Sequence, residues 1–459
     1  MGSTVSLGLT YCCCTSAGAL CNTCLGTTAA GTTGRKRAVL LLSVAIALAL
    51  WFQYSVAPSI VQESGFVWRT YRLIPGMGKM VYHSWKDTAC ERYEGDLLSQ
   101  CAGNAGVYRP MFLATIFFLV SALAVKANPA LNRESWPAKY GIFFFALLIC
   151  MFLPNAPLFS GVYLWFARLA AAVFVVLQQI ILIDVSYNLN DEWVDKSNEL
   201  DRVSYGSGQG WLRLILGTSV FFYASALTGI GLLYHFFAGC PENTWVITLT
   251  LLGMVAMTAI QLSGTEGSLL TSSIMSLYAT YLAFSIVSKN PNGTCNPRLG
   301  HTDVWGIVVG LTLTAVSLAW TGWSWSAEHR LNGIDSVQST KAISVPSSGE
   351  GNPDSVNLDV PFLDPEDQPT SGIVMEQSGG VTGTDLWKLN IVMALISCWV
   401  AMTLTGWGTI SDIKEDSHAA NPTAGRVNMA ILGISQWLAI GLYVWTLLAP
   451  RIFPDRDFS

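Results

Sequence analysis

Ten long apolar runs, separated by polar segments, constrain this chain more than any other feature. They cover residues 38–57, 108–126, 140–153, 162–188, 211–235, 244–262, 268–287, 304–325, 386–407 and 427–448. A helix needs about 20 apolar residues to cross the hydrocarbon core of a bilayer, and most of these runs approach that length. Only 12% of the residues are charged, against roughly 25% in an average soluble domain. Because lipid offers no partner to free backbone groups, the sequence predicts an all-α polytopic membrane protein with about ten transmembrane helices.

Basic residues ahead of the first run predict the orientation of the chain. Arg35, Lys36 and Arg37 directly precede this run, and no small-residue cleavage site follows it, which is typical of an uncleaved signal anchor. The N-terminus is therefore expected in the cytosol, and ten spans return the C-terminus to the same side. The 25 Lys and Arg residues are scattered, so no nucleic-acid partner is expected. The sequence leaves open whether the membrane belongs to the endomembrane system (ER, Golgi or vacuole) or is the plasma membrane.

Composition divides the chain into four segments. Residues 1–34 form a Cys-rich segment at the cytosolic face, and residues 35–326 hold the first eight spans, with a luminal loop at 58–107. Residues 327–385 are rich in Ser, Gly, Pro and acidic side chains. Such a segment cannot bury enough apolar surface to offset chain entropy, so we expect a disordered cytosolic loop. Residues 386–459 contain the last two spans and a short tail.

Four cysteines and one sequon fall on the side that this topology places in the lumen. The oxidising compartment allows two disulfides there, and we predict Cys90–Cys101 and Cys240–Cys295. Asn292 begins the only Asn-x-Thr/Ser sequon without an interfering proline, so it is a candidate glycosylation site.

A second group of cysteines lies in the N-terminal segment. Its members are Cys12, Cys13, Cys14, Cys21 and Cys24. Cysteines close to a membrane anchor are candidates for palmitoylation, and Gly2 fits a myristoylation pattern. The alternative interpretation, an apolar segment in the interface or an additional short helix, is equally compatible with these residues. No His or acidic residue accompanies the cysteines, so no metal site is predicted.

The fourth apolar run is unusually long and polar. With its continuation it covers residues 162–193, and it carries five candidate groove residues: Arg168, Gln178, Gln179, Asp184 and Asn188. At about 100° per residue, Arg168 and Gln179 share one face, whereas Asp184 and Asn188 lie nearly opposite. A helix that is polar on both sides cannot present either side broadly to lipid, so it is expected to cross the middle of the molecule. Its polar groups either fix helix packing or line a groove that admits a lipid headgroup.

Signatures of catalysis are sparse along the chain. The five histidines are dispersed, and the glycine-rich stretch at 206–210 lacks the lysine of a phosphate-binding loop. We therefore predict neither an enzyme nor a bound cofactor.

Several motifs resemble one known family. They lie at 177–194, 272–282, 295–297, 402–407, 442–450 and 456–458, with further matches at 73–77 and 107–109. Together they are similar to the serine incorporator family over nearly the whole chain, the loop at 327–385 excepted. The resemblance implies ten helices in two subdomains, bisected by a long diagonal helix. It also implies one of two activities: help in incorporating serine into phosphatidylserine and sphingolipids, or ATP-independent scrambling of phospholipids between leaflets.

Buried polar groups without a catalytic set favour scrambling, with membrane phospholipids as the partners. An accessory role beside lipid-synthesising enzymes is the first alternative, and solute or ion transport is the second. Lipid selectivity and oligomeric state are left open by the sequence.

Overall fold

The computed structural model describes residues 32–62, 68–70, 73, 76–86, 90–128, 131, 135–263, 268–299, 304–319, 386–410 and 421–452. Within these ranges, eight helices are long and apolar enough to cross a membrane, and two shorter apolar helices, Trp136–Cys150 and Val304–Ala319, accompany them. All ten coincide with the predicted runs, which confirms the all-α polytopic fold. The N-terminal lipidation candidates Gly2, Cys12, Cys13, Cys14, Cys21 and Cys24, and the loop at 327–385, lie outside the described residues.

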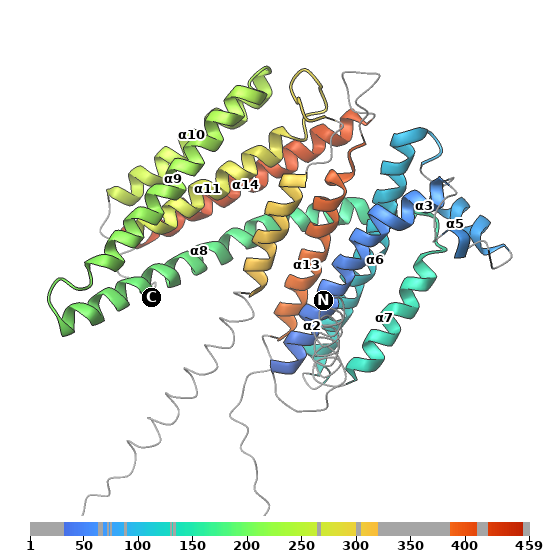
Figure 1. The fold of residues 1–459 in the computed structure, drawn as a ribbon, viewed down its shortest axis with the longest axis horizontal. Helices are drawn as coiled ribbons and strands as arrows, with labels where there is room; N and C mark the ends of the chain where they lie inside the picture. Colours follow the sequence, from blue (N-terminus) through green and yellow to red (C-terminus); the bar gives the residue numbers. More distant parts are fainter. Residues whose placement is uncertain are drawn as a thin grey trace, which may run out of the picture.

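The helices form two groups on either side of one long helix (Figure 1). The first group contains α2 (Thr32–Trp51), α6 (Gly95–Ala127), α7 (Trp136–Cys150) and α13 (Leu386–Leu404). The second group contains α9 (Gln209–Phe237), α10 (Pro241–Leu262), α11 (Leu269–Val287) and α14 (Pro422–Ile452). Between them runs α8 (Leu164–Val203), which crosses the molecule diagonally and packs against α13 of the first group and α11 and α14 of the second.

The helix Val304–Ala319 makes a second connection between the groups. Its Thr314 hydroxyl accepts a hydrogen bond from the Trp399 indole of α13 at 3.1 Å. On its other side, the Tyr281 hydroxyl of α11 donates to the Gly306 carbonyl at 3.5 Å. This short helix and α8 therefore both touch the two groups.

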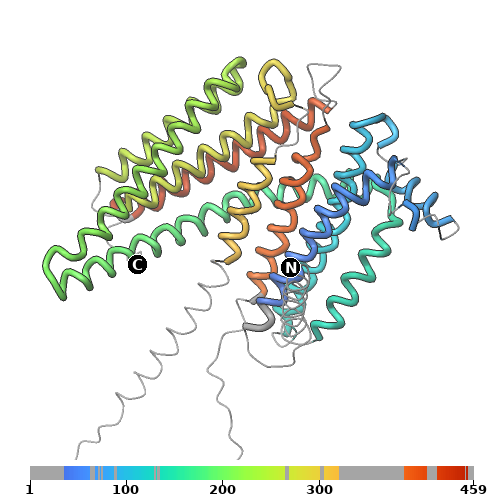
Figure 2. Tube along the Cα trace, in the orientation of Figure 1, coloured from blue at the N-terminus to red at the C-terminus, as the bar shows by residue number. Residues whose placement is uncertain are grey.

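Both disulfides lie at one end of the bundle, which we call the disulfide end. Cys90–Cys101 ties the segment before α6 to its second turn, and Cys240–Cys295 ties the α9–α10 connection to the loop after α11. The tube in Figure 2 shows that α2 begins and α14 ends at the opposite end. This arrangement is the one expected of an even number of spans.

Much of the described part of the segment 58–107, which the sequence predicts as the connection between the first two spans, is helical. It contains α3 (Ala57–Val61), α5 (Met77–Lys86) and the first third of α6. The sequence suggested a loop because these residues are too polar for a span. They are nevertheless helical, since α5 buries Val81 and Trp85 against the protein, and α6 packs Gly106 closely on the backbone of Phe52.

A buried arginine holds the break between α7 and α8. Arg109 of α6 donates to the carbonyl groups of Cys150 and Leu153 at 3.0 and 2.9 Å, and to the side-chain oxygen of Asn155 at 3.0 Å. Its guanidinium lies 4.2 Å from the centre of the Trp85 ring. These bonds supply donors to carbonyl groups at and after the end of α7, where η3 (Asn155–Tyr163) leads directly into α8.

Candidate functional site

Three of the five predicted groove residues are buried in helix packing. The Arg168 guanidinium donates from Nη2 to the carbonyl of Trp407 at 3.0 Å, and the Gln179 amide donates to the carbonyl of Ala439 at 2.6 Å. Gln178 accepts a hydrogen bond from the Tyr278 hydroxyl at 3.5 Å. These bonds join α8 to both helix groups, which matches its predicted place in the middle of the molecule.

The other two residues, Asp184 and Asn188, are exposed on the opposite face of α8, as the helical spacing predicted. Asn188 donates to the Asp184 carboxylate at 3.0 Å. None of the five residues lines either of the two cavities described next. Their role as groove residues stays a prediction, while the bonds of Arg168, Gln178 and Gln179 agree with the alternative expectation that polar groups of this helix fix helix packing.

A polar chamber of about 320 Å³ lies at the disulfide end, between the two helix groups. Its wall is formed by η1 (Phe52–Val56), the start of α6, the ends of α11 and α13, and the turn η4 (Gly406–Gly408). Hydroxyl and amide side chains supply most of its polar surface, and Lys289 and Arg298 are its two cations. None of the described lining residues is acidic. The described wall of the chamber is therefore largely polar.

The turn η4 shapes one wall of the chamber. Gly406, Trp407 and Gly408 all have positive φ angles, of 55°, 63° and 72°. An L-residue such as tryptophan rarely adopts this conformation, so surrounding contacts must hold it. The Trp407 carbonyl accepts hydrogen bonds from both Arg168 and Asn428, each at 3.0 Å, and these two donors hold the turn in place.

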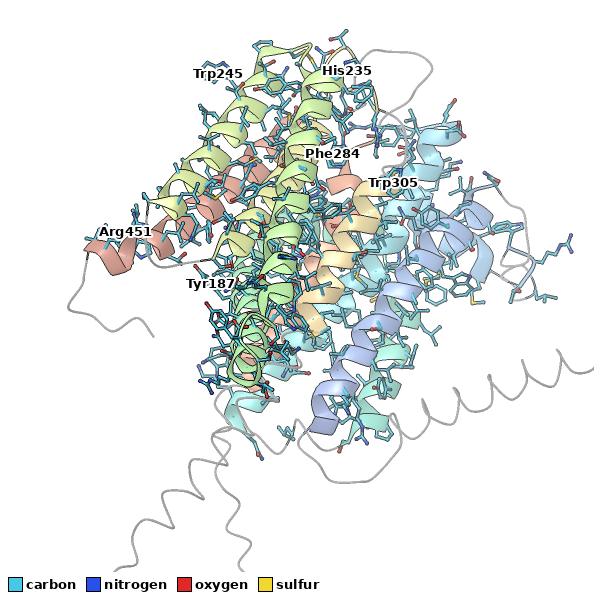
Figure 3. All side chains as sticks on the ribbon, turned by 60° about the vertical axis from the view of Figure 1, so that its left-hand side comes forward. Tyr187, His235, Trp245, Phe284, Trp305 and Arg451 are labelled. Carbon is cyan, nitrogen blue, oxygen red and sulfur yellow. A yellow bond between two sulfur atoms is a disulfide. The ribbon has the colours of Figure 1, made fainter. Side chains whose placement is uncertain are left out.

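An apolar groove of about 710 Å³ lies beside the chamber, between α9, α11 and the helix Val304–Ala319. It follows α9 from Ser225 to Phe237, a length of about 18 Å at 1.5 Å per residue. In the most apolar 18-residue stretch of α9, only 17% is buried, against 72% for the corresponding stretch of α11. The helix α9 therefore faces the surroundings of the protein. Phe284 and Trp305 of the groove lie near the disulfide end in Figure 3.

The chamber and the groove meet. Tyr281, Arg298 and Gly306 line both of them, and we call these three residues the junction. The Arg298 guanidinium lies 5.8 Å from the centre of the Phe284 ring in the groove. The two cavities together therefore form one amphipathic cleft, with a polar part and an apolar part.

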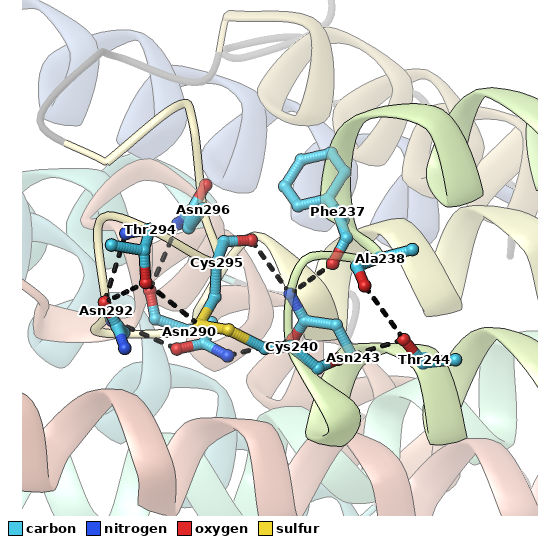
Figure 4. The surroundings of a disulfide bond; sticks show 10 residues. All are labelled: Phe237, Ala238, Cys240, Asn243, Thr244, Asn290, Asn292, Thr294, Cys295 and Asn296. Carbon is cyan, nitrogen blue, oxygen red and sulfur yellow. Dashed lines mark hydrogen bonds between the residues drawn. A yellow bond between two sulfur atoms is a disulfide. The ribbon is translucent and has the colours of Figure 1, made fainter.

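The loop that carries Arg298 is fixed by a disulfide and a set of asparagines (Figure 4). Asn243 of α10 donates to the carbonyl of Cys295 at 2.9 Å and accepts from the Asn290 amide at 2.9 Å. Asn296 donates to the Ser288 carbonyl at 2.9 Å and accepts from the backbone N–H of Arg298 at 3.1 Å. These bonds fix the backbone of Arg298 relative to the end of α11.

The same loop holds the predicted glycosylation residue. Asn292 is partly exposed, and its side-chain oxygen accepts from the Thr294 hydroxyl at 2.8 Å, so the sequon forms a local turn. Its modification stays a prediction. Among the described residues, no three His, Cys, Asp or Glu side chains lie close enough together to hold a metal ion.

Sequence reasoning missed the chamber and its cations. Lys289 and Arg298 flank a short loop, and charged residues beside a span are ordinarily solvated. The available signal was their position on either side of Cys295, whose disulfide pulls the loop towards the end of α9.

The fold and the cleft define a class of protein: a polytopic α-helical membrane protein with an amphipathic cavity between two helix groups. The sequence profile of the serine incorporator family matches residues 11–456, which is nearly the whole chain. The chain belongs to the serine incorporator family.

Individual relatives agree with this assignment. A probable serine incorporator of Nematostella vectensis is 25% identical over 396 residues, which covers 81% of this chain and 84% of the relative. Serine incorporator 3 of Mus musculus is 25% identical over 424 residues, covering 81% and 83%. Serine incorporator 2 of Homo sapiens is 25% identical over 383 residues, covering 78% and 80%.

Proposed function

We propose that this protein transports lipids by moving phospholipids between the two leaflets without ATP. The observation that carries the proposal is the junction, where an apolar groove on the outer surface of the bundle continues into a polar chamber. A phospholipid has the same two parts, a polar headgroup and apolar chains. The cleft offers each part a matching environment.

The energetic obstacle to scrambling is the passage of the headgroup through hydrocarbon. A polar group without hydrogen-bond partners costs several kcal/mol there, at about 2–7 kcal/mol per group. The hydroxyl and amide side chains of the chamber can replace water as partners, while the acyl chains stay in the groove and in the surrounding lipid. The groove extends for about 18 Å, which is more than half of the thickness of the bilayer hydrocarbon, about 30 Å.

Contacts between α9 and α11 define the floor of the groove. A Cβ atom on Gly229 of α9 would lie only 2.7 Å from the Thr280 methyl group of α11, so glycine permits this close approach. Leu232 and Phe236, which follow Gly229 along α9 and line the groove, are more than half exposed. The groove is therefore accessible from the bilayer.

The test is a reconstitution experiment. The full-length protein is placed in liposomes that contain a trace of acyl-labelled fluorescent phospholipid, and a membrane-impermeant quencher reports the fraction of label in the outer leaflet. We expect quenching to exceed the outer-leaflet fraction without added ATP. Quenching that stops at that fraction in protein-containing vesicles would refute the proposal.

A matched pair of variants links the activity to the groove. Ser225→Trp places a bulky side chain in the groove, whereas Val255→Trp places one on the exposed surface of α10, away from both cavities. We expect the first variant to slow lipid movement at least about tenfold, equivalent to about 1.4 kcal/mol, and the second to leave it unchanged. Equal effects of the two would remove the groove from the mechanism.

The relatives are named serine incorporators, which suggests a different role as an accessory of lipid-synthesising enzymes. That role predicts co-purification with such an enzyme and altered serine incorporation in cells, with no lipid movement in liposomes. We further propose that both termini face the cytosol, in an endomembrane or the plasma membrane.

A further inference from the structure

We propose that Arg168 and Asn428 form a headgroup site, closed in this structure by the turn η4, that takes a phosphate linked to a hydrogen-bond-donating group. A phosphoethanolamine headgroup has this chemistry, whereas phosphocholine lacks the donor. The inference rests on the proposed function and deepens it, because it adds a site behind the chamber wall and names the headgroups that the site prefers.

Arg168 carries a buried charge with which no carboxylate forms an ion pair in the described ranges. The residue is only 4% exposed; its Nη2 donates to the Trp407 carbonyl, while its Nε has no hydrogen-bond partner. The guanidinium lies 5.3 Å from the centre of the Trp165 ring, a contact that attracts the cation but supplies no negative charge. Burial of a charge is costly unless the charge is paired and hydrogen-bonded. A phosphate supplies both, because a guanidinium donates paired hydrogen bonds to phosphate oxygens.

Asn428 of α14 completes the set of polar groups at this site. It is buried, and its side-chain nitrogen donates to the same Trp407 carbonyl that Arg168 bonds, each at 3.0 Å. Two donors therefore converge on one oxygen, which is the arrangement that a phosphate oxygen requires. The side-chain oxygen of Asn428 is buried without a partner. Buried polar atoms are rarely left unpaired, so this acceptor indicates a hydrogen-bond donor beside the phosphate of the ligand.

The Trp407 carbonyl occupies the place of the phosphate oxygen, and the turn that carries it is strained. Trp407 has a φ angle of 63°, in the left-handed region that is unfavourable for a residue with a bulky side chain. Such strain persists only while surrounding groups hold the backbone, and the two donors to the Trp407 carbonyl do so here. A ligand that bonds to these donors removes that hold. Gly406 and Gly408 flank the tryptophan and allow the backbone to rotate, because glycine adopts either sign of φ.

Only the backbone of η4 separates this site from the chamber. Trp407 and Gly406 line the chamber, whereas Arg168 and Asn428 do not, although both bond to Trp407. Asn421 donates to the Gly408 carbonyl at 2.9 Å, so the end of the turn stays anchored when the Trp407 carbonyl rotates away. A headgroup in the chamber then reaches both donors, while its acyl chains extend through the junction into the groove.

The binding test uses the full-length protein in detergent and two probes of equal chain length, short-chain phosphatidylethanolamine and short-chain phosphatidylcholine. The increase of the unfolding temperature with probe concentration gives each dissociation constant. Both headgroups are zwitterionic, so a difference between them reports the hydrogen-bond donor and not the net charge. We expect the wild type to bind the ethanolamine lipid about tenfold more tightly, because only this lipid satisfies the buried acceptor.

Four variants assign the preference to the site. Arg168→Gln should weaken the binding of both lipids at least about tenfold, because it removes the charge that holds the phosphate. Asn428→Asp keeps the shape of the side chain and gives Arg168 an internal ion pair, so the protein should stay folded and also lose both lipids. Asn428→Leu removes the acceptor and should bring the ratio of the two affinities to about one. Arg213→Gln, which replaces an exposed arginine outside both cavities, should leave both affinities unchanged.

Hydrogen exchange tests whether the headgroup displaces η4. The backbone N–H of Gly408 donates to the Thr405 carbonyl at 3.0 Å, which protects this amide. Bound phosphatidylethanolamine should raise the deuterium uptake of a peptide that covers residues 405–409 in the wild type and not in Arg168→Gln. Binding without a change of uptake would show that the lipid does not open this turn, and would reject the closed site.

Equal affinities for the two lipids in the wild type, or unchanged binding in Arg168→Gln and Asn428→Asp, would overturn the inference and leave lipid movement itself intact. Glycerophosphoethanolamine, the same headgroup without acyl chains, separates a lipid from a soluble ligand. If it binds as tightly as the lipid, the site takes a soluble phosphoester and the lipid assignment is rejected. A preference in detergent without lipid movement in liposomes would refute the proposed function and still support the headgroup site.

Discussion

Arg168 on the diagonal helix and Trp407 in the left-handed turn after α13 are joined by a hydrogen bond of 3.0 Å, from the guanidinium to the main-chain carbonyl. The same carbonyl accepts a second bond from Asn428 of α14, also at 3.0 Å. One acceptor in the wall of the chamber thus connects α8, η4 and α14.

This shared acceptor predicts non-additive effects on stability. Arg168→Ala or Asn428→Ala alone leaves the Trp407 carbonyl with one donor, so each should lower the free energy of unfolding by about 1–2 kcal/mol. The double variant leaves a buried carbonyl unpaired and should cost more than the sum of the two. Unfolding of the four proteins in detergent gives the coupling energy. Strict additivity would show that the two donors do not share this acceptor.

Replacement of Arg109 should have a larger and purely structural effect on the free energy of unfolding. Arg109→Leu removes the donor of the Leu153 carbonyl and of the Asn155 side-chain oxygen, and one of two donors of the Cys150 carbonyl; each unpaired buried acceptor costs about 1–3 kcal/mol. We therefore expect a loss of at least about 3 kcal/mol in the same unfolding measurement. The exposed Arg213→Leu variant is the control and should change stability by less than about 0.5 kcal/mol.

The two disulfides should contribute unequally to stability. Cys240–Cys295 closes a separation of 55 residues and Cys90–Cys101 one of 11. In the chain-entropy description, these correspond to about 4 and about 3 kcal/mol. Paired Cys→Ser variants of each bridge, unfolded side by side, should show the larger loss for the longer loop. A larger loss from the shorter loop would mean that local packing, not loop closure, sets the order.

Tyr281 at the junction should control the passage between the two cavities. Its hydroxyl bonds to Gly306, and its side chain lines both cavities. Tyr281→Ala widens the junction and is expected to speed lipid movement by about two- to tenfold, equivalent to about 0.4–1.4 kcal/mol, whereas Tyr281→Phe keeps the ring and should change it little. Slower movement in the alanine variant would argue that the tyrosine guides the lipid and does not restrict it.

The sequon at Asn292 offers a test of which side of the membrane the disulfide end faces. If the disulfide end is luminal, enzymatic removal of N-glycans should reduce the apparent mass of the wild-type protein made in eukaryotic cells. Asn292→Gln and Thr294→Val should each abolish that shift. An unchanged wild-type mass would withdraw support for the predicted orientation.

Periodicity and run length predicted the helices well, because a bilayer imposes a fixed length of apolar sequence on each span. The length and two-sided polarity of the segment at 162–193 likewise predicted a helix through the middle, and the structure extends it to Val203. The cleft was not predictable in this way. It depends on where α9 and the helix Val304–Ala319 diverge, which long-range packing decides, and on a loop placed by the Cys240–Cys295 bridge.

Polarity alone also could not separate packing from function. Arg168 and Gln179 carry the same sequence signal that groove residues would carry, yet both bond to main-chain carbonyl groups of other helices. Whether a buried polar side chain faces a cavity or a carbonyl depends on the partner helix, which a single sequence does not reveal. The π-helical segment η1, whose Gln53 lines the chamber, has no compositional signature either.

The unbroken course of α8 has a mechanical consequence. Its 40 residues form a rod about 60 Å long, and both groups of helices are fastened to it. The two helix groups cannot separate as independent bodies. The cleft between them can therefore widen only by rotation of one group about the axis of α8. A tilt of only about 5° over that length would displace its far end by about 5 Å. A small rotation at the Val203 end of α8 would therefore change the spacing of the helices near its Leu164 end.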